Sequence, residues 1–155
     1  MTISPEEAAQ AVERGLHKIG NPEVGAVSAS GHAGEPLFVT RLDEPNRDYY
    51  LVPWRDHRGI ILVAMVDASR GEILSAAVLP NPHLTLAMTP DEVRRAVEIR
   101  LGRSILGEPR LVWRPCQESP SPVQPLYQVP LQEGDAFVGV DGSVYRSLTP
   151  FGRGG

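Results

Sequence analysis

The chain has 155 residues, the length of one ordinary domain or two small ones. Apolar residues make up 41% and charged residues 22%, values typical of a globular protein that exclude a disordered tail, a coiled coil and a membrane protein. The net charge of −4 argues against nucleic acid and against anionic membranes as partners, because phosphate groups are bound by basic surfaces.

Two features of the sequence bear on its compartment. The single cysteine, Cys116, cannot form a disulfide within the chain, so no oxidising environment is implied. The first residues contain no basic stretch followed by an apolar run, which a secretory signal would need. We therefore expect a cytoplasmic protein, with an exported origin left open if a leader has been removed from this sequence.

A duplicated segment is the clearest internal pattern. SPEEAAQAVERGL at 4–16 aligns without a gap with TPDEVRRAVEIRL at 89–101, with six identical positions. Each copy has a hydroxyl residue suited to an N-cap, then proline, then glutamate three residues after the cap. Apolar residues follow at helical spacing, so the pattern predicts two amphipathic helices. The two apolar stripes are Ala8, Val12, Leu16 and Ile19, and Val93, Val97, Leu101 and Ile105.

Runs that are apolar or alternate with period two, bounded by turn residues, predict strands after each helix. In the first half these runs are 24–28, 37–42, 49–54, 60–67 and 72–79. In the second half they are 110–114, 126–131, 136–141 and 143–148. The short connections, several with glycine, predict antiparallel pairing, and the proline-containing stretches 80–88 and 115–125 are expected to be irregular.

The helix at 4–16, the Tyr50-x-Val52 strand and the sequence VDASRGEIL at 66–74 together resemble the PepSY domain, a small cystatin-like module. The second half resembles it less fully, with VDGSVY at 140–145. The resemblance implies an α+β fold of two cystatin-like repeats, 1–84 and 85–155, packed as one unit. Each repeat would be one helix packed on an antiparallel β-meander. Such domains have been proposed to inhibit peptidases or to bind proteins near the cell envelope, and they supply no catalytic residues to carry over.

The strands at 49–54 and 60–67 carry apolar side chains on both faces, which is typical of strands covered on both sides. We expect Tyr50, Val52 and Trp54 to face the helix. The cover of the other face would be the second half of the chain, an identical subunit or a foreign protein. The candidate binding residues on that face are Tyr49, Leu51, Ile61 and Val63.

The residues that could carry chemistry favour ordinary structural roles. Cys116 lies in a proline-rich loop with no histidine nearby in sequence, and the four histidines lack the spacing of metal ligands. The acidic pairs at 6–7 and 91–92 are explained by helix capping. We expect no enzyme activity, no catalytic residues, no metal and no cofactor.

The leading hypothesis is a non-catalytic protein-binding or regulatory module that acts through its sheet surface, with a peptidase inhibitor as its specific form. Its partner would be another protein, such as a peptidase, or a second copy of the chain, with no nucleic acid and no membrane. One alternative is a small-ligand-binding protein or enzyme that uses the concave sheet or a cleft between the repeats. Another is an immunity or antitoxin-type protein.

Overall fold

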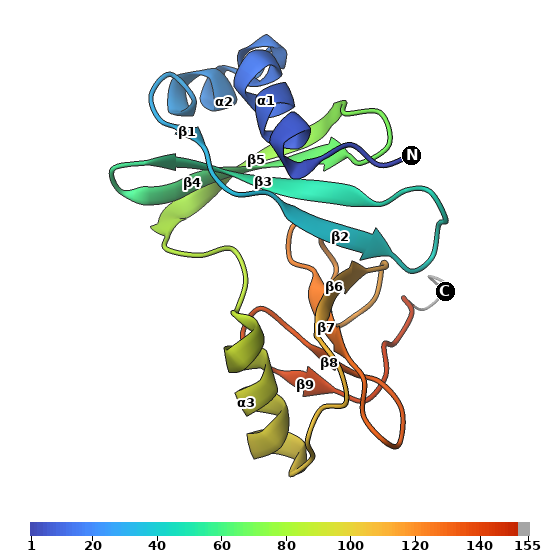
Figure 1. The fold of residues 1–155 in the computed structure, drawn as a ribbon. Helices are drawn as coiled ribbons and strands as arrows, with labels where there is room; N and C mark the ends of the chain where they lie inside the picture. The colour runs from blue at the N-terminus through green and yellow to red at the C-terminus, as the bar shows by residue number, and fades with distance from the viewer. Residues whose placement is uncertain (152–155) are drawn as a thin grey trace. The chain divides into compact units, whose positions relative to one another are not determined.

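The computed structural model describes residues 1–151 and has a mixed α+β fold with a large, mainly antiparallel sheet (Figure 1). The α+β class expected from the sequence is thereby confirmed. The chain divides into two compact units. Unit 1 comprises Met1–Val39 and Glu44–Leu86, and unit 2 comprises Thr40–Asp43 and the chain from Ala87 onward. The second repeat expected from the sequence, 85–155, extends at 152–155 beyond the described residues.

The first helix of unit 1, α1 (Pro5–Gly15), begins where the capping pattern predicts. The Ser4 Oγ accepts a hydrogen bond from the Glu7 amide at 3.1 Å, and the Glu7 carboxylate accepts one from the Ser4 amide at 3.5 Å. The helix then tightens into the 3₁₀ turn η1 (Leu16–Lys18). This change of winding takes Ile19 off the predicted apolar stripe, and its side chain is 40% exposed.

A second helix, α2 (Pro22–Val27), stands where the sequence predicts a strand, so that prediction is wrong. The Asn21 side chain accepts hydrogen bonds from the amides of Glu23 and Val24, at 2.9 and 3.3 Å, and Pro22 occupies the first helical position. Such a cap satisfies amides that a helix start would otherwise leave unpaired. The apolar run at 24–28 is too short for its periodicity to distinguish a helix from a strand.

The strands of unit 1 are β1 (His32–Ala33), the first three residues of β2 (Leu37–Arg41), β3 (Tyr49–Asp56), β4 (Gly59–Asp67) and β5 (Ile73–His83). They run in the order β5-β4-β3-β2, with β1 also paired to β3, and every pair within unit 1 is antiparallel. The helices α1 and α2 lie over one face of this sheet (Figure 1). The core between them is formed by Ala8, Val12, Leu16, Val24, Tyr50, Val52, Trp54, Ile61, Leu62, Ala64, Val66 and Ala68.

Strand β5 is longer than the sequence predicts, because it continues through Pro80 and Pro82 to His83. The pairing with β4 shifts register between Ile60 and Leu62, opposite this proline segment. Proline is tolerated at such irregular positions and on end strands, where its missing N–H breaks no ladder hydrogen bond.

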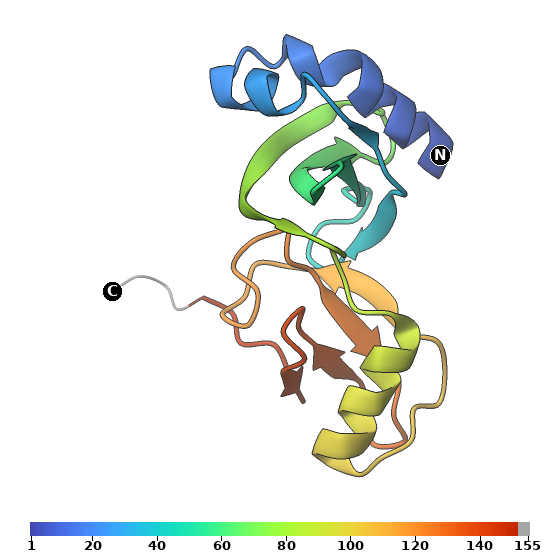
Figure 2. The same ribbon diagram turned by 90° about the vertical axis from the view of Figure 1, so that its left-hand side faces the viewer.

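Unit 2 begins with α3 (Pro90–Leu101), capped by Thr89 and Glu92 as predicted and ended by Gly102 in the left-handed conformation at φ 61°. The strands β6 (Arg110–Trp113), β7 (Leu126–Val129), β8 (Ala136–Val138) and β9 (Val144–Tyr145) form an antiparallel meander. The end of β2, at Thr40 and Arg41, pairs with β6 in parallel. Figure 2 shows α3 running along one side of these strands. Its buried contacts are Val93 and Val97 against Val129, Leu131, Ala136 and Val138.

One tyrosine in each unit ties a strand to the start of the helix that packs on it. The Tyr50 hydroxyl donates to the Ile3 carbonyl at 2.8 Å, and the Tyr127 hydroxyl donates to the Met88 carbonyl at 2.8 Å. Both carbonyls belong to the residue directly before the helix cap. Burial first, and then the nearby glutamates, raise the pKa of both phenols further above neutral pH, where a tyrosine hydroxyl is already protonated and can donate.

Replacing Tyr50 or Tyr127 with phenylalanine should therefore lower the free energy of unfolding by about 1 kcal/mol in each case, the usual contribution of one such hydrogen bond. Urea unfolding of the two variants measures this loss. Tyr145→Phe is the matched control, because its hydroxyl makes no hydrogen bond within residues 1–151. Equal stability of all three variants would contradict the anchoring role.

Candidate functional site

The four residues expected on an open sheet face are all buried. The exposed fraction is 0% for Tyr49, 1% for Leu51, 4% for Ile61 and 1% for Val63. Ile61 also packs into the helix-side core, because it is the extra residue where the register shifts between Trp54 and Arg55. These residues therefore form no accessible patch in the described part of the chain.

The candidate metal ligands do not cluster within residues 1–151. Cys116 is fully buried and its Sγ lies 3.8 Å from the Ser119 carbonyl oxygen. Across residues 1–151, no group of three or more His, Cys, Asp and Glu side chains could hold a metal ion. In the same part of the chain, no helix has the length and apolar character needed to cross a bilayer.

Asp67 and Asp141 organise turns at equivalent places in the two units. The Asp67 Oδ1 accepts hydrogen bonds from the Ser69 amide, the Ser69 hydroxyl and the Arg70 amide, at 2.7–2.8 Å. Asp141 accepts two from Ser143, at 3.0 and 2.9 Å. Burial alone would raise the pKa of Asp67, but these hydrogen bonds outweigh it and lower that pKa. The pKa of Asp141 is lowered mainly by the hydrogen bonds from Ser143.

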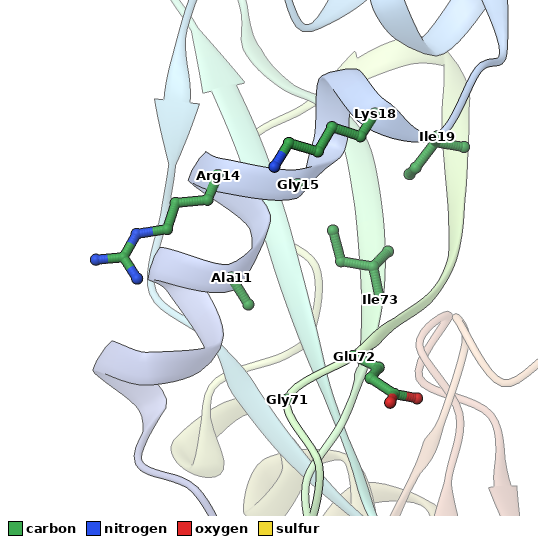
Figure 3. Close-up of a pocket in the computed structure, with 8 residues that line it drawn as sticks. All are labelled: Ala11, Arg14, Gly15, Lys18, Ile19, Gly71, Glu72 and Ile73. Carbon is green, nitrogen blue, oxygen red and sulfur yellow. The ribbon is translucent and has the colours of Figure 1, made fainter.

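Within unit 1, a groove lies between α1 and the start of β5 (Figure 3). It is an open cavity of about 400 Å³. Its lining comes from Ala11, Arg14, Gly15, Lys18, Ile19, Gly71, Glu72 and Ile73.

Glycines allow the groove's two walls to meet. A Cβ at Gly15 would lie 3.1 Å from the Ile73 Cδ1, so this position admits a larger residue only if the isoleucine moves. Gly71 has φ 74° and ends the Asp67 turn directly before β5. The turn and the close helix contact together set the position of Ile73 in the groove.

The rim of the groove is basic on the helix side. Arg14 and Lys18 are exposed, and neither has an ion pair or side-chain hydrogen bond within residues 1–151. The acid in the lining is Glu72, and Figure 3 shows its carboxylate pointing away from both cations. Arg14 and Lys18 are four residues apart, so they lie on the same side of the helical segment formed by α1 and η1. This spacing is visible in the sequence, although no motif there points to it.

Beside the groove, β5 is the end strand of the unit 1 sheet and pairs only with β4 among the described strands. It has 11 residues and none of them is Asp, Glu, Lys or Arg. The segment 74–79 also lacks proline, and Leu74 is 49% exposed. End strands usually carry lysine, proline or a bulge that prevents pairing with another chain, and this segment has only a register shift at each of its ends.

No protein-family model, no curated protein and no solved structure matches this chain. The assignment of a site therefore rests on geometry and chemistry alone.

The turn at Asp67 gives a pH-dependent prediction. Because the pKa of Asp67 is lower in the folded than in the unfolded protein, its ionised form stabilises the fold above about pH 4, and this stabilisation is lost as the pH falls further. Asp67→Asn should lower the free energy of unfolding by about 1–2 kcal/mol at pH 7 and by less at pH 3.

Denaturant unfolding followed by fluorescence of Trp54, which lies in unit 1, measures both values. Glu35→Gln, at an exposed position of the same unit, is the control and should change stability little at either pH. A loss for Asp67→Asn that is the same at pH 7 and pH 3 would contradict this account of the turn.

Proposed function

We propose that this protein is a non-catalytic recognition module that binds an extended segment of another protein along the free edge of β5. The single observation that carries the proposal is the long end strand without Asp, Glu, Lys or Arg, which among the described strands pairs on one side only. Added strands gain affinity from backbone hydrogen bonds and specificity from the side chains that alternate along them.

The length of β5 is sufficient for such binding. A strand rises about 3.3 Å per residue, so the six residues at 74–79 span about 20 Å, as long as an average strand of a globular protein. The central residues Ser75, Ala76 and Ala77 have small side chains, which leave the backbone of the strand accessible to a neighbour. An added strand would also extend the face on which α1 and α2 pack.

We further propose that the two units are PepSY-like, cystatin-like repeats with bounds near 1–84 and 85–155. Three pairs of matched interactions support this proposal. They are the caps at Ser4 and Thr89, the tyrosine hydrogen bonds of Tyr50 and Tyr127, and the turns at Asp67 and Asp141. The resemblance makes a peptidase the first class of partner to test.

A selection from a random 12-residue peptide library, displayed as an internal fusion with no free carboxyl end, tests the recognition proposal. The protein should enrich peptides with alternating apolar residues. Leu74→Lys and Ser75→Lys, at exposed positions of β5, should each weaken binding of the enriched peptides at least about tenfold, equivalent to the loss of one good hydrogen bond.

Thr85→Lys is the matched control, since it adds the same charge to unit 1 at an exposed position outside the strands, and it should leave binding unchanged. Peptide binding that survives both β5 substitutions would overturn the proposal, and so would a library that yields no enriched peptide. A dimer in sedimentation equilibrium that Ser75→Lys dissociates would also overturn it, because a second copy would then occupy the edge.

A further inference from the structure

The groove beside β5 indicates which kind of side chain the bound segment carries. This inference rests on the proposed strand addition. Gly71, Glu72 and Ile73 line the groove and also lead into the strand. A segment paired with the free edge would therefore place a side chain at this end of the strand against the groove, on the face that α1 covers.

The floor of the groove is apolar and shallow. Ala11, Ile19 and Ile73 supply aliphatic surface, and Gly15 supplies none beyond its backbone. Such a floor suits the methylene stem of a side chain, whereas its polar end would reach the rim.

The rim of the groove carries more positive than negative charge. Arg14 and Lys18 bring two positive charges from α1 and η1, and neither has an ion-pair partner in the described chain. Glu72 brings one negative charge from the opposite wall and points away from them (Figure 3). Charge complementarity favours a carboxylate in this groove over a neutral or basic group, because Arg14 and Lys18 both carry positively charged N–H donors at its rim.

We infer that the segment bound along β5 carries an Asp or Glu side chain at one fixed position, and that Lys18 and Arg14 bind this carboxylate in the groove. The partner is thus an extended, mainly apolar segment with an acidic residue at the end that meets the start of β5. An exposed ion pair of this kind adds modest affinity but fixes the register of the added strand, because a shift by one residue moves the acid to the other face.

Lys18 offers a direct test because it is the only lysine among the 15 basic Lys and Arg residues. The probes are the peptides enriched on the wild-type protein, made with acetylated N-termini and amidated C-termini so that any carboxylate is a side chain. A carbodiimide joins a carboxylate to an amine in contact with it. The expected result is an amide bond between the peptide's side-chain carboxyl carbon and the Lys18 Nζ, with the water lost taken up by the carbodiimide. Mass spectrometry locates this bond, and Lys18→Arg should abolish it while binding remains.

Affinity gives the second readout. Changing the peptide's acid to its amide should weaken binding about three- to fivefold at low salt, the range of exposed ion pairs, and the difference should vanish at 1 M salt, where the Debye length is about 3 Å. The double variant Arg14→Gln with Lys18→Gln should show no such preference. Arg95→Gln with Arg100→Gln removes the same charge from exposed positions of α3 and should keep it.

Peptides that need an intact β5 but show no acidic preference, or that couple to the protein elsewhere than Lys18, would overturn this inference and leave strand addition standing. Peptides that bind equally well to the Leu74→Lys and Ser75→Lys variants would overturn strand addition itself, and this inference with it.

Discussion

The main physical constraint on this molecule is that the backbone N–H and C=O groups on the outer side of an end strand need hydrogen-bond partners. A strand inside a sheet pairs its N–H and C=O groups on both sides, whereas an end strand pairs on one side and leaves the remainder to water or to another chain. In unit 1 that strand is β5, with 11 residues and no Asp, Glu, Lys or Arg. Its two prolines, Pro80 and Pro82, stand near one end and leave the segment 74–79 open to a partner.

The rest of unit 1 holds this edge in place. Strands β3 and β4 are apolar on both faces and almost wholly buried, so they form the rigid part of the sheet. Helix α1 packs on them through Ala8, Val12 and Leu16, and it ends at Gly15, where it meets Ile73 at the start of β5. The basic groove is a consequence of this contact: the helix turns that carry Arg14 and Lys18 end beside the open strand.

The sequence was most informative where local chemistry determines structure. The caps at Ser4 and Thr89 predict both long helices correctly, since a hydroxyl, a proline and a glutamate at fixed spacing satisfy the first amides of a helix. The strand predicted at 24–28 is wrong, because a short apolar run does not distinguish a strand from the helix that Asn21 caps. Apolar character on both faces of β3 and β4 predicted burial but not which residues stay accessible, because exposure depends on contacts between segments far apart in sequence. The groove could not be predicted for the same reason: it joins residues 11–19 with residues 71–73.

Amide hydrogen exchange of β5, with and without a saturating enriched peptide, tests the central claim most directly. In the free protein, the amides of Ile73–Leu79 that do not pair with β4 should exchange rapidly, and peptide binding should slow every second amide by at least about tenfold, as a newly formed ladder requires. Protection that appears at other surfaces while these β5 amides keep their free-state rates would contradict recognition by strand addition.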